Sequence, residues 1–345
     1  MIRIGLIGLG FMGRVHLRCY TADPRAVVTA IADPNPNVLD ASAERGNLAD
    51  DAGLTPDQLS AIHRYDSHAA LLADDSIDAV SICSPTALHV PLAIDALRAG
   101  KHVLVEKPLA LSSELAMQTV HVADEHPHLV AMPAMCMRFW PAWHWLHEAI
   151  HDGRFGAVRS ATFTRIGSMP RWAAFYANAD ESGAAILDLH IHDADFVRYC
   201  FGDPDQVEST GYSETTSGID HIVTRYQFAD GPPIVAAEGS WCMKPGFAFT
   251  MRYLVNFERA TAAFNLAGTP ELRVSTAENA SEWEHLPTGT GYQPEIASFL
   301  DCIARKNGSE QRVSMLDGAL AVRLVEAERT SALERRPVEF RSHVS

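Results

Sequence analysis

Three glycines near the start of the chain are spaced to hold a phosphate group. Gly8, Gly10 and Gly13 form the pattern G-x-G-x-x-G between an apolar run and a helical pattern. The first glycine of such a motif allows a tight turn, the second lets the backbone approach a diphosphate, and the third lets helix and strand pack closely. We expect Phe11 and Met12 to donate backbone N–H groups to the anion at the helix N-terminus. The motif therefore predicts dinucleotide binding.

An acidic residue stands where the ribose of a dinucleotide is expected. Asp33 closes the next apolar run, 20 residues after Gly13, and a carboxylate at this distance typically accepts the ribose hydroxyls. A 2′-phosphate there would meet like-charge repulsion, and the following Pro34-Asn35 supplies no cation. The sequence therefore favours NAD over NADP. The alternative interpretation is that Asp33 is only a turn residue before Pro34.

Three further residues could transfer protons or stabilise charge. Asp188 and His192 are four residues apart, which on a helix turns both side chains to one face. A histidine titrates near neutral pH and can take a hydroxyl proton while a hydride leaves the same carbon. Lys107 follows a buried strand, so we expect it at the carboxyl edge of a parallel sheet, where its ammonium favours a developing alkoxide. The alternatives are a core histidine and a surface lysine.

One short segment matches a motif of a different kind of enzyme. His147-Glu148-Ala149-Ile150-His151 matches H-E-x-x-H, the pattern in which zinc peptidases place two metal-binding histidines and a glutamate base. No third ligand follows at the usual spacing, the helix is amphipathic, and 16 histidines make a chance match easier. We predict no metal site, and a zinc metallopeptidase stays a remote alternative.

The sequence around the N-terminal motifs predicts stacked βαβ units. Residues 1–133 alternate short apolar runs with helical stretches, which predicts a dinucleotide-binding Rossmann domain with a doubly wound parallel sheet. Pro91 and Gly100 mark the start and the end of one helix. Strands are expected at Ile2–Ile7, Val27–Ala32, Ala79–Ile82, His102–Val105 and Leu129–Met132.

From residue 134 to residue 345 the apolar runs are longer and alternate with polar residues. Between Phe249 and Phe257 every second residue is apolar, with Leu254 as an exception, which predicts an antiparallel sheet with one buried face. We predict an α+β domain that binds substrate and forms oligomers through an open, mostly antiparallel sheet. An uncovered sheet face favours a homodimer or homotetramer. Further strands are expected at 158–166, 221–228 and 234–241, and helices at 143–151, 294–307 and 314–333.

Composition narrows the class of protein. The chain has 345 residues, enough for two domains, and 28 basic against 43 acidic residues give a net charge of −15. The acidic excess argues against a nucleic-acid or membrane-surface partner. The six cysteines contain no C-x-x-C pair, which fits a reducing cytoplasm. A small molecule is the expected partner.

Three motifs together resemble one family. The glycine motif at 8–13 is the first, and Asp188-Leu189-His190-Ile191-His192-Asp193 is the third. The second runs from Ser84-Pro85-Thr86 and His89 to Glu106-Lys107-Pro108. With them the chain resembles the glucose-fructose oxidoreductase, inositol dehydrogenase and rhizopine catabolism family (Gfo/Idh/MocA) over essentially its whole length. It departs from the family at Ser182-Gly183-Ala184-Ala185, where a glycine cluster is usual.

The resemblance implies an NAD(P)-dependent oxidoreductase that moves a hydride between nicotinamide and a secondary alcohol carbon of a cyclic polyol, sugar or sugar derivative. It implies that Lys107, Asp188 and His192 are catalytic. It adds Ser84, Pro85, His89, Glu106 and Lys107 to the cofactor-binding residues, and it places Arg138, Arg171 and Trp172 beside the substrate. Two alternatives are an NAD-dependent glycosidase with a transient redox step and a non-catalytic NAD-binding regulator.

Overall fold

The computed structural model describes residues 1–35, 62–171, 173–278, 282–283, 286, 289–305 and 311–340. It divides into two compact units. Unit 1 comprises Met1–Cys136 and Tyr292–Ala319, and unit 2 comprises Met137–Gly291 and Leu320–Ser345. Residues 292–319 thus belong with the N-terminal segment, although the sequence analysis assigned them to the second domain. The division at residue 133 stays a prediction.

Unit 1 contains a six-stranded parallel sheet with the order β3-β2-β1-β4-β5-β6. This order confirms the predicted doubly wound fold. Strand β6 begins two residues later than predicted, and just before it the Val130 N–H donates to His102 Nδ1 (2.8 Å). It continues through Pro133, which an edge strand tolerates. The strands are β1 (Ile2–Ile7), β2 (Ala26–Ala32), β3 (His63–Tyr65), β4 (Ala79–Ile82), β5 (His102–Glu106) and β6 (Ala131–Ala134).

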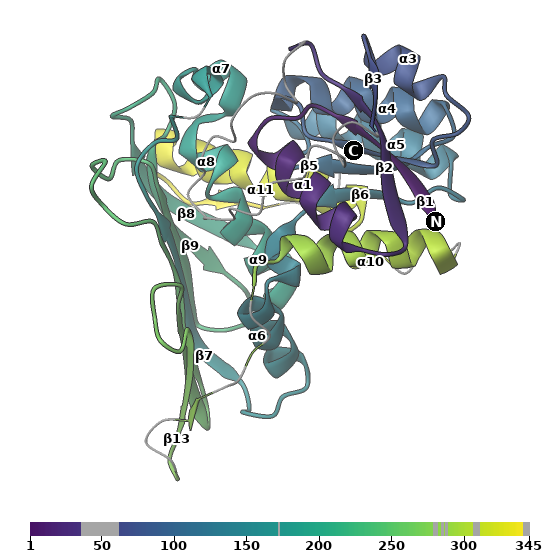
Figure 1. Ribbon diagram of the computed structural model, residues 1–345. Coiled ribbons are helices and arrows are strands. Elements are labelled where there is room, and N and C mark those ends of the chain that lie inside the picture. Colours follow the sequence, from purple (N-terminus) through teal and green to yellow (C-terminus); the bar gives the residue numbers. More distant parts are fainter. Residues whose placement is uncertain are drawn as a thin grey trace. The chain divides into compact units, whose positions relative to one another are not determined.

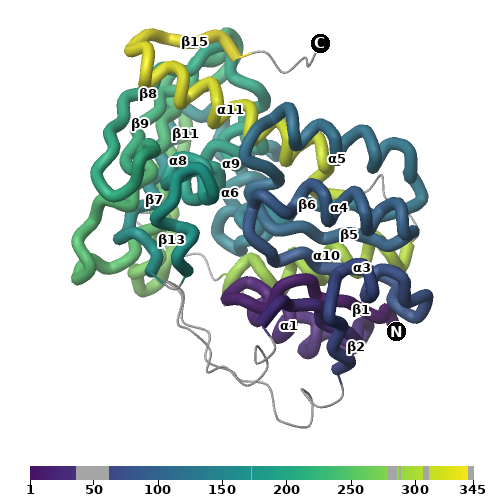
Figure 2. Tube along the Cα trace, turned by 90° about the horizontal axis from the view of Figure 1, so that it is seen from above, coloured from purple at the N-terminus to yellow at the C-terminus, as the bar shows by residue number. Residues whose placement is uncertain are grey.

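Helices pack against the sheet of unit 1. Helix α10 (Tyr292–Arg305) lies beside α1 (Phe11–Ala22), as Figure 2 shows. A shared apolar core joins α3 (His68–Leu72), α4 (His89–Arg98), α5 (Ser113–Glu125) and the start of α11 (Met315–Glu334). Ser314 and Asp317 form a capping box at the start of α11: Asp317 N donates to Ser314 Oγ (3.1 Å), and Ser314 N donates to Asp317 Oδ2 (2.8 Å).

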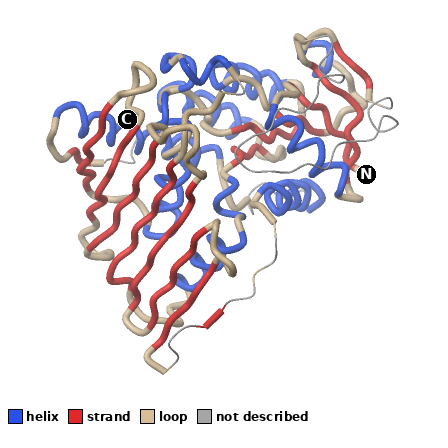
Figure 3. Tube along the Cα trace, turned by 60° about the vertical axis from the view of Figure 1, so that its left-hand side comes forward, coloured by secondary structure: helices blue, strands red, loops and turns tan. Residues whose placement is uncertain are grey.

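Unit 2 contains a nine-stranded sheet in the order β14-β13-β12-β11-β7-β10-β9-β8-β15. Strands β7 and β10 run parallel and the other neighbours antiparallel, which confirms the mostly antiparallel prediction; Figure 3 shows the strands side by side. They are β7 (Val158–Ile166), β8 (Gln206–Tyr212), β9 (His221–Gln227), β10 (Ile234–Ser240), β11 (Thr250–Phe257), β12 (Ala260–Asn265), β13 (Leu272–Thr276), β14 (Glu282–Trp283) and β15 (Val338–Glu339).

One face of this sheet is covered by helices of the same unit (Figure 1). Trp143 of the first helix is fully buried, and its ring contacts those of Phe163, Phe196 and Tyr253. Through these contacts the buried face of β11 packs against the helices. The helices are α6 (Pro141–His151), α7 (Ala179–Ser182), α8 (Ala184–Asp188) and α9 (Ile191–Phe201).

The opposite face of the sheet is exposed and mixes polar with apolar side chains. Leu254, the exception in the alternation of β11, lies on this face with 51% of its surface exposed, and Val223 is 44% exposed. The predicted self-association through this face stays a prediction. Among the described residues, no helix is both long enough and apolar enough to cross a bilayer.

Candidate active site

The glycine-rich loop joins β1 to α1 and fits a bound diphosphate. Gly8 has φ +90°, and a Cβ there would lie 2.6 Å from the Cys83 carbonyl oxygen; at Gly13 it would lie 2.2 Å from the Gly8 oxygen. At Gly10, by contrast, no atom of a described residue lies within 4 Å of the Cβ position. Helix α1 starts at Phe11 without a side-chain cap and with no acidic residue in its first turn. The loop therefore keeps open space beside a positive helix end.

Asp33 at the end of β2 is tied to this loop. Its Oδ2 accepts a hydrogen bond from the Leu9 backbone N–H (2.8 Å), and its Oδ1 accepts one from Asn35 N (2.8 Å). A carboxylate has about four acceptor sites, so ribose hydroxyls can still bind. Cations reach this region from elsewhere in the chain: Arg64 Nη2 donates to the Asp33 carbonyl oxygen (3.3 Å), and the charge of Arg14 interacts with Asp33. Neither arginine was predicted near Asp33, because the preference for NAD rested on Pro34 and Asn35 alone.

His89 joins the two parts of the second motif. Its Nδ1 lies 2.7 Å from the Pro108 carbonyl oxygen, and its Nε2 lies 2.8 Å from the Ser84 carbonyl oxygen. The ring is buried, and burial lowers the pKa of His89. Both nitrogens are therefore engaged within the protein. The Ser84 hydroxyl is buried and makes no hydrogen bond to any described residue, so a ligand could satisfy it; the cofactor contacts of Ser84, Pro85 and His89 stay predictions.

Glu106 and His16 form a buried pair next to Lys107. His16 on α1 points at the sheet, with Nδ1 2.7 Å from Ser81 Oγ and Nε2 3.0 Å from Glu106 Oε1. The second carboxylate oxygen of Glu106 accepts the Lys107 backbone N–H (3.0 Å). Burial opposes a charge on His16, but Cys83 and Glu106 outweigh it and raise the pKa of His16 well above its ordinary value. Glu106 thus braces the backbone that carries Lys107.

A second carboxyl group lies in the same polar core. Glu295 of α10 is fully buried, and neither carboxyl oxygen has a hydrogen-bond partner among the described residues. Burial, with the nearby charge of Glu106, raises the pKa of Glu295 well above its ordinary value. Burial therefore favours the neutral, protonated form of this carboxyl group.

The segment predicted to hold Asp188 and His192 on one regular helix is broken in two. Asp188 ends α8 and His192 lies in the first turn of α9. At the junction the backbone N–H groups of both Leu189 and His190 donate to the Ala185 oxygen (3.0 and 2.9 Å). The bond from His190 spans five residues, so the helix is locally wide, as in the π-bulges found at many functional sites. The regular four-residue phase assumed from the sequence therefore does not hold.

Helix α9 is fixed by buried ion pairs on residues that flank His192. Asp193 binds Arg165 through both oxygens (2.9 and 3.2 Å), and Asp195 binds Arg138 in the same way (2.9 and 2.6 Å). All four side chains are buried. Such bidentate pairs hold a helix in one orientation.

His190, the residue just before the start of α9, also lies beside a carboxylate. Its Nε2 lies 3.0 Å from Glu328 Oε2, and the Tyr226 hydroxyl donates to Glu328 Oε1 (2.7 Å). A Cβ at Gly239 would lie 2.7 Å from the His190 side chain, so the strand passes close to the imidazole.

The three residues predicted beside the substrate have different surroundings. Arg138 is buried in the pair with Asp195 and packs over the Tyr199 ring (4.6 Å). Arg171 is exposed on a loop, and Trp172 lies outside the described residues. The buried pair gives Arg138 a structural role, and substrate contact by any of the three stays a prediction.

Sequence reasoning missed several polar residues of these two regions. His16 follows Gly13 by one helical turn, which was a usable signal for an inward-facing polar group. Glu295 and Glu328 carried no local signal, because each looks like an ordinary acidic residue of an amphipathic helix. The polar groups near them, Glu106 and His16 for Glu295 and Tyr226 and His190 for Glu328, come from distant parts of the chain.

The comparisons with known proteins agree with the architecture. Residues 2–133 match the model of an oxidoreductase family with an NAD-binding Rossmann fold, and residues 143–263 match the GFO/IDH/MocA C-terminal domain. Inositol 2-dehydrogenase of Rhizobium meliloti is 26% identical over 98% of this chain and 99% of its own. D-xylose 1-dehydrogenase (NADP(+)) 2 of Haloferax volcanii is 28% identical over 84% and 88%.

A solved structure supports the fold as a whole. Levoglucosan dehydrogenase in complex with NADH and levoglucosan superposes with a TM-score of 0.85 and covers 99% of this chain and 100% of its own. Its sequence identity is 22%, so the likeness concerns the fold.

Proposed function

The chain belongs to the GFO/IDH/MocA family of oxidoreductases, and from this premise we propose that it transfers a hydride between NAD and a secondary alcohol carbon of a cyclic polyol, sugar or sugar derivative. The glycine loop of unit 1 carries the proposal, because Gly10 leaves room for a diphosphate at an uncapped helix end. The inositol and xylose dehydrogenases among the relatives support a sugar-like substrate.

NAD, when bound, supplies a nicotinamide carbon that accepts the hydride. The glycine loop would hold the diphosphate and Asp33 the ribose hydroxyls, while Ser84, Pro85 and the 106–108 segment would border the cofactor. The carboxylate of Asp33 favours NAD, as two free ribose hydroxyls suit it better than a phosphate. The cations Arg14 and Arg64 make NADP the competitor to test.

The protein groups of the reaction would act on the alcohol. In alcohol oxidation the C–H bond breaks as a hydride leaves, and the O–H proton must go to a base. We assign that base to His192, with Asp188 binding the same hydroxyl. The Lys107 ammonium would stabilise negative charge on the oxygen as the proton departs.

A screen of inositols and aldoses with NAD+, followed at the 340 nm band of NADH, tests the activity. Net NADH formation with a cyclic polyol or sugar is the expected result. An NAD-dependent glycosidase would release sugar without net NADH, and a regulator would do neither. Parallel assays with NADP+ test the cofactor preference.

The base assignment is tested with His192→Ala. We expect kcat to fall about 10²- to 10⁴-fold while NAD affinity stays the same, because a positioned base contributes to the chemical step and not to cofactor binding. His121→Ala, on the exposed side of α5, is the control and should keep wild-type turnover. Unchanged turnover in His192→Ala would remove that residue from the mechanism.

A further inference from the structure

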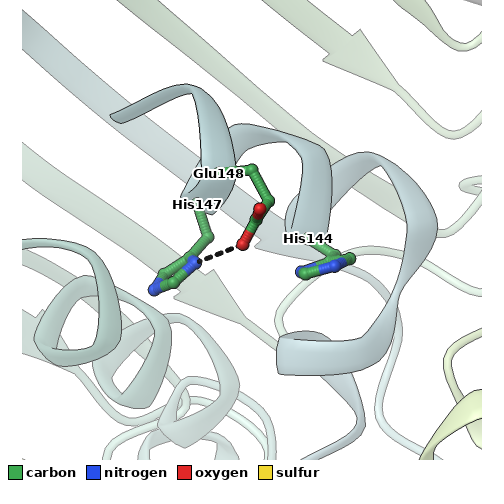
Figure 4. Close-up of side chains that lie close together, drawn as sticks. All are labelled: His144, His147 and Glu148. Atoms are coloured by element: carbon green, nitrogen blue, oxygen red, sulfur yellow. Dashed lines mark ion pairs between the residues drawn. The ribbon is translucent and has the colours of Figure 1, made fainter. Parts of the chain in front are cut away.

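Helix α6 presents three potential metal ligands on neighbouring turns. Among the described residues, one nitrogen each of His144 and His147 and an oxygen of Glu148 lie within 4.8 Å of one another. The spacing i, i+3, i+4 explains this, since residues three and four apart are neighbours on a helix surface. Figure 4 shows the Glu148 carboxylate turned toward the His147 ring, with the His144 ring on the next turn.

One of the three ligands is held in place before any ion binds. The His147 ring stacks on the Tyr199 ring of α9, with centroids 3.7 Å apart and planes 8° from parallel. Its Nδ1 is buried and has no hydrogen-bond partner among the described residues, and Glu148 Oε1 lies 3.6 Å away. A buried imidazole nitrogen without a hydrogen bond is uncommon in proteins. His147 Nδ1 is a potential metal ligand that lies beside the Glu148 carboxylate, so the two groups could bind one ion.

We propose that His144, His147 and Glu148 bind a divalent transition-metal ion of the zinc type. Imidazole nitrogens and a carboxylate oxygen suit zinc, nickel and copper, and bonds to zinc are about 2.0 to 2.2 Å long. Two ligand atoms of a tetrahedral zinc therefore lie about 3.4 Å apart, so donor atoms up to 4.8 Å apart must close by up to about 1.4 Å. The Glu148 side chain is 55% exposed and can rotate to do so.

This site differs in chemistry from the H-E-x-x-H pattern in the same helix. A zinc peptidase would use His147 and His151 as ligands and Glu148 as base. Here Glu148 is a ligand, and His151 lies outside the group whose donor atoms converge. With its carboxylate on the metal, the site has no base for peptide hydrolysis. A bound ion would instead stabilise the folded chain by mass action.

The test is a titration of metal-free, full-length protein with ZnCl₂ against a chromophoric chelator. We expect one saturable site. His144→Ala and Glu148→Gln should each weaken it by at least about 10- to 100-fold, since even the loss of a residue behind a ligand costs that much. His151→Ala is the matched control on the same helix and should leave the affinity unchanged. If His151→Ala abolishes binding and His144→Ala does not, the peptidase pattern is the real site and the proposal is wrong.

Cobalt substitution separates this site from the cysteines. Co²⁺ bound by nitrogen and oxygen gives visible d–d bands without the intense near-ultraviolet absorption of a cobalt–thiolate bond, and that is the expected spectrum. A thiolate band, or the absence of any saturable binding, would overturn the proposal. Zn²⁺ should also raise the Tm of the wild type and of His151→Ala but not that of His144→Ala. Dehydrogenase turnover at saturating substrate should be the same in all these variants, because none of the three residues belongs to the proposed catalytic set.

Discussion

The two units bury polar side chains beside their candidate catalytic residues, but with different chemistry. In unit 1, Glu106 contacts Lys107, and the buried His16 and Glu295 lie near Glu106; all three side chains can gain or lose a proton. Next to His192 in unit 2 the helix is held by Arg165 and Arg138. A guanidinium keeps its charge at every pH at which proteins are folded.

The difference separates two ways of supporting a site. A buried arginine–aspartate pair fixes the orientation of α9 over a wide pH range. The His16–Glu106 pair beside the Lys107 backbone keeps its ionic attraction only while His16 is protonated. We therefore expect the positioning of Lys107 to depend on pH more than the positioning of His192.

The largest effect is expected where a permanent charge loses its partner. Asp195→Asn leaves the Arg138 guanidinium buried beside a neutral group, which costs about 3 to 5 kcal/mol of unfolding free energy. All six tryptophans lie in the sequence of unit 2, so urea unfolding followed by tryptophan fluorescence reports on this unit.

Asp152→Asn is the matched control, because Asp152 pairs with Arg154 through side chains that are more than 40% exposed. Its loss should shift the same transition far less, as exposed pairs contribute little. Equal shifts in the two variants would mean that burial does not distinguish the pairs.

A smaller effect that varies with pH is expected from His16→Gln. Glutamine cannot bond Ser81 and Glu106 as the imidazole does, and an unsatisfied buried partner costs about 1 to 3 kcal/mol. Because the pKa of His16 is raised in the folded state, its stabilisation is complete below the unfolded pKa and is lost as pH rises through the folded pKa. Urea-dependent amide exchange of β5 should show a smaller difference from wild type at pH 9 than at pH 6.

His89→Gln provides the contrast within unit 1. The pKa of His89 is lowered by burial, so both the folded and the unfolded forms are neutral above about pH 7. Its difference from wild type should stay constant from pH 7 to pH 9. A parallel decline in both variants would show that the pH dependence comes from a group other than His16.

The sequence predicted much of the fold because the signals are local. Each buried parallel strand of unit 1 is a short apolar run, and β11 alternates over eight residues. The assignment of α10 to unit 1 could not be predicted, since nothing in its own residues indicates that its apolar face packs against α1, more than 270 positions earlier.

The candidate site likewise contains residues that local sequence predicts and residues that it does not. The glycine loop and Asp33 are predictable because turn geometry and strand ends constrain them. His16 and Glu106, by contrast, are 90 positions apart, and Arg138 and Asp195 are 57 apart. The pairing of Arg138 with Asp195 could not be predicted, because a sequence shows a charge but not the partner that neutralises it.

The smallest effect at acidic pH, and the sharpest test of the comparison, is expected from Glu295→Gln. Below the unfolded pKa the carboxyl is neutral in both states, so a neutral amide of the same shape should change the unfolding free energy little at acidic pH. Since the pKa of Glu295 is raised in the folded state, the wild type loses stability as pH rises above the unfolded pKa, by up to about 1.4 kcal/mol per pH unit until the folded pKa is reached. The variant escapes this loss and should become the more stable protein in amide exchange of α10 at alkaline pH.

Glu328→Gln is the control, because Glu328 is a paired carboxylate in unit 2. This variant should destabilise its unit at neutral pH. A similar loss in Glu295→Gln would show that Glu295 is charged and paired, and that the polar cores of the two units are alike.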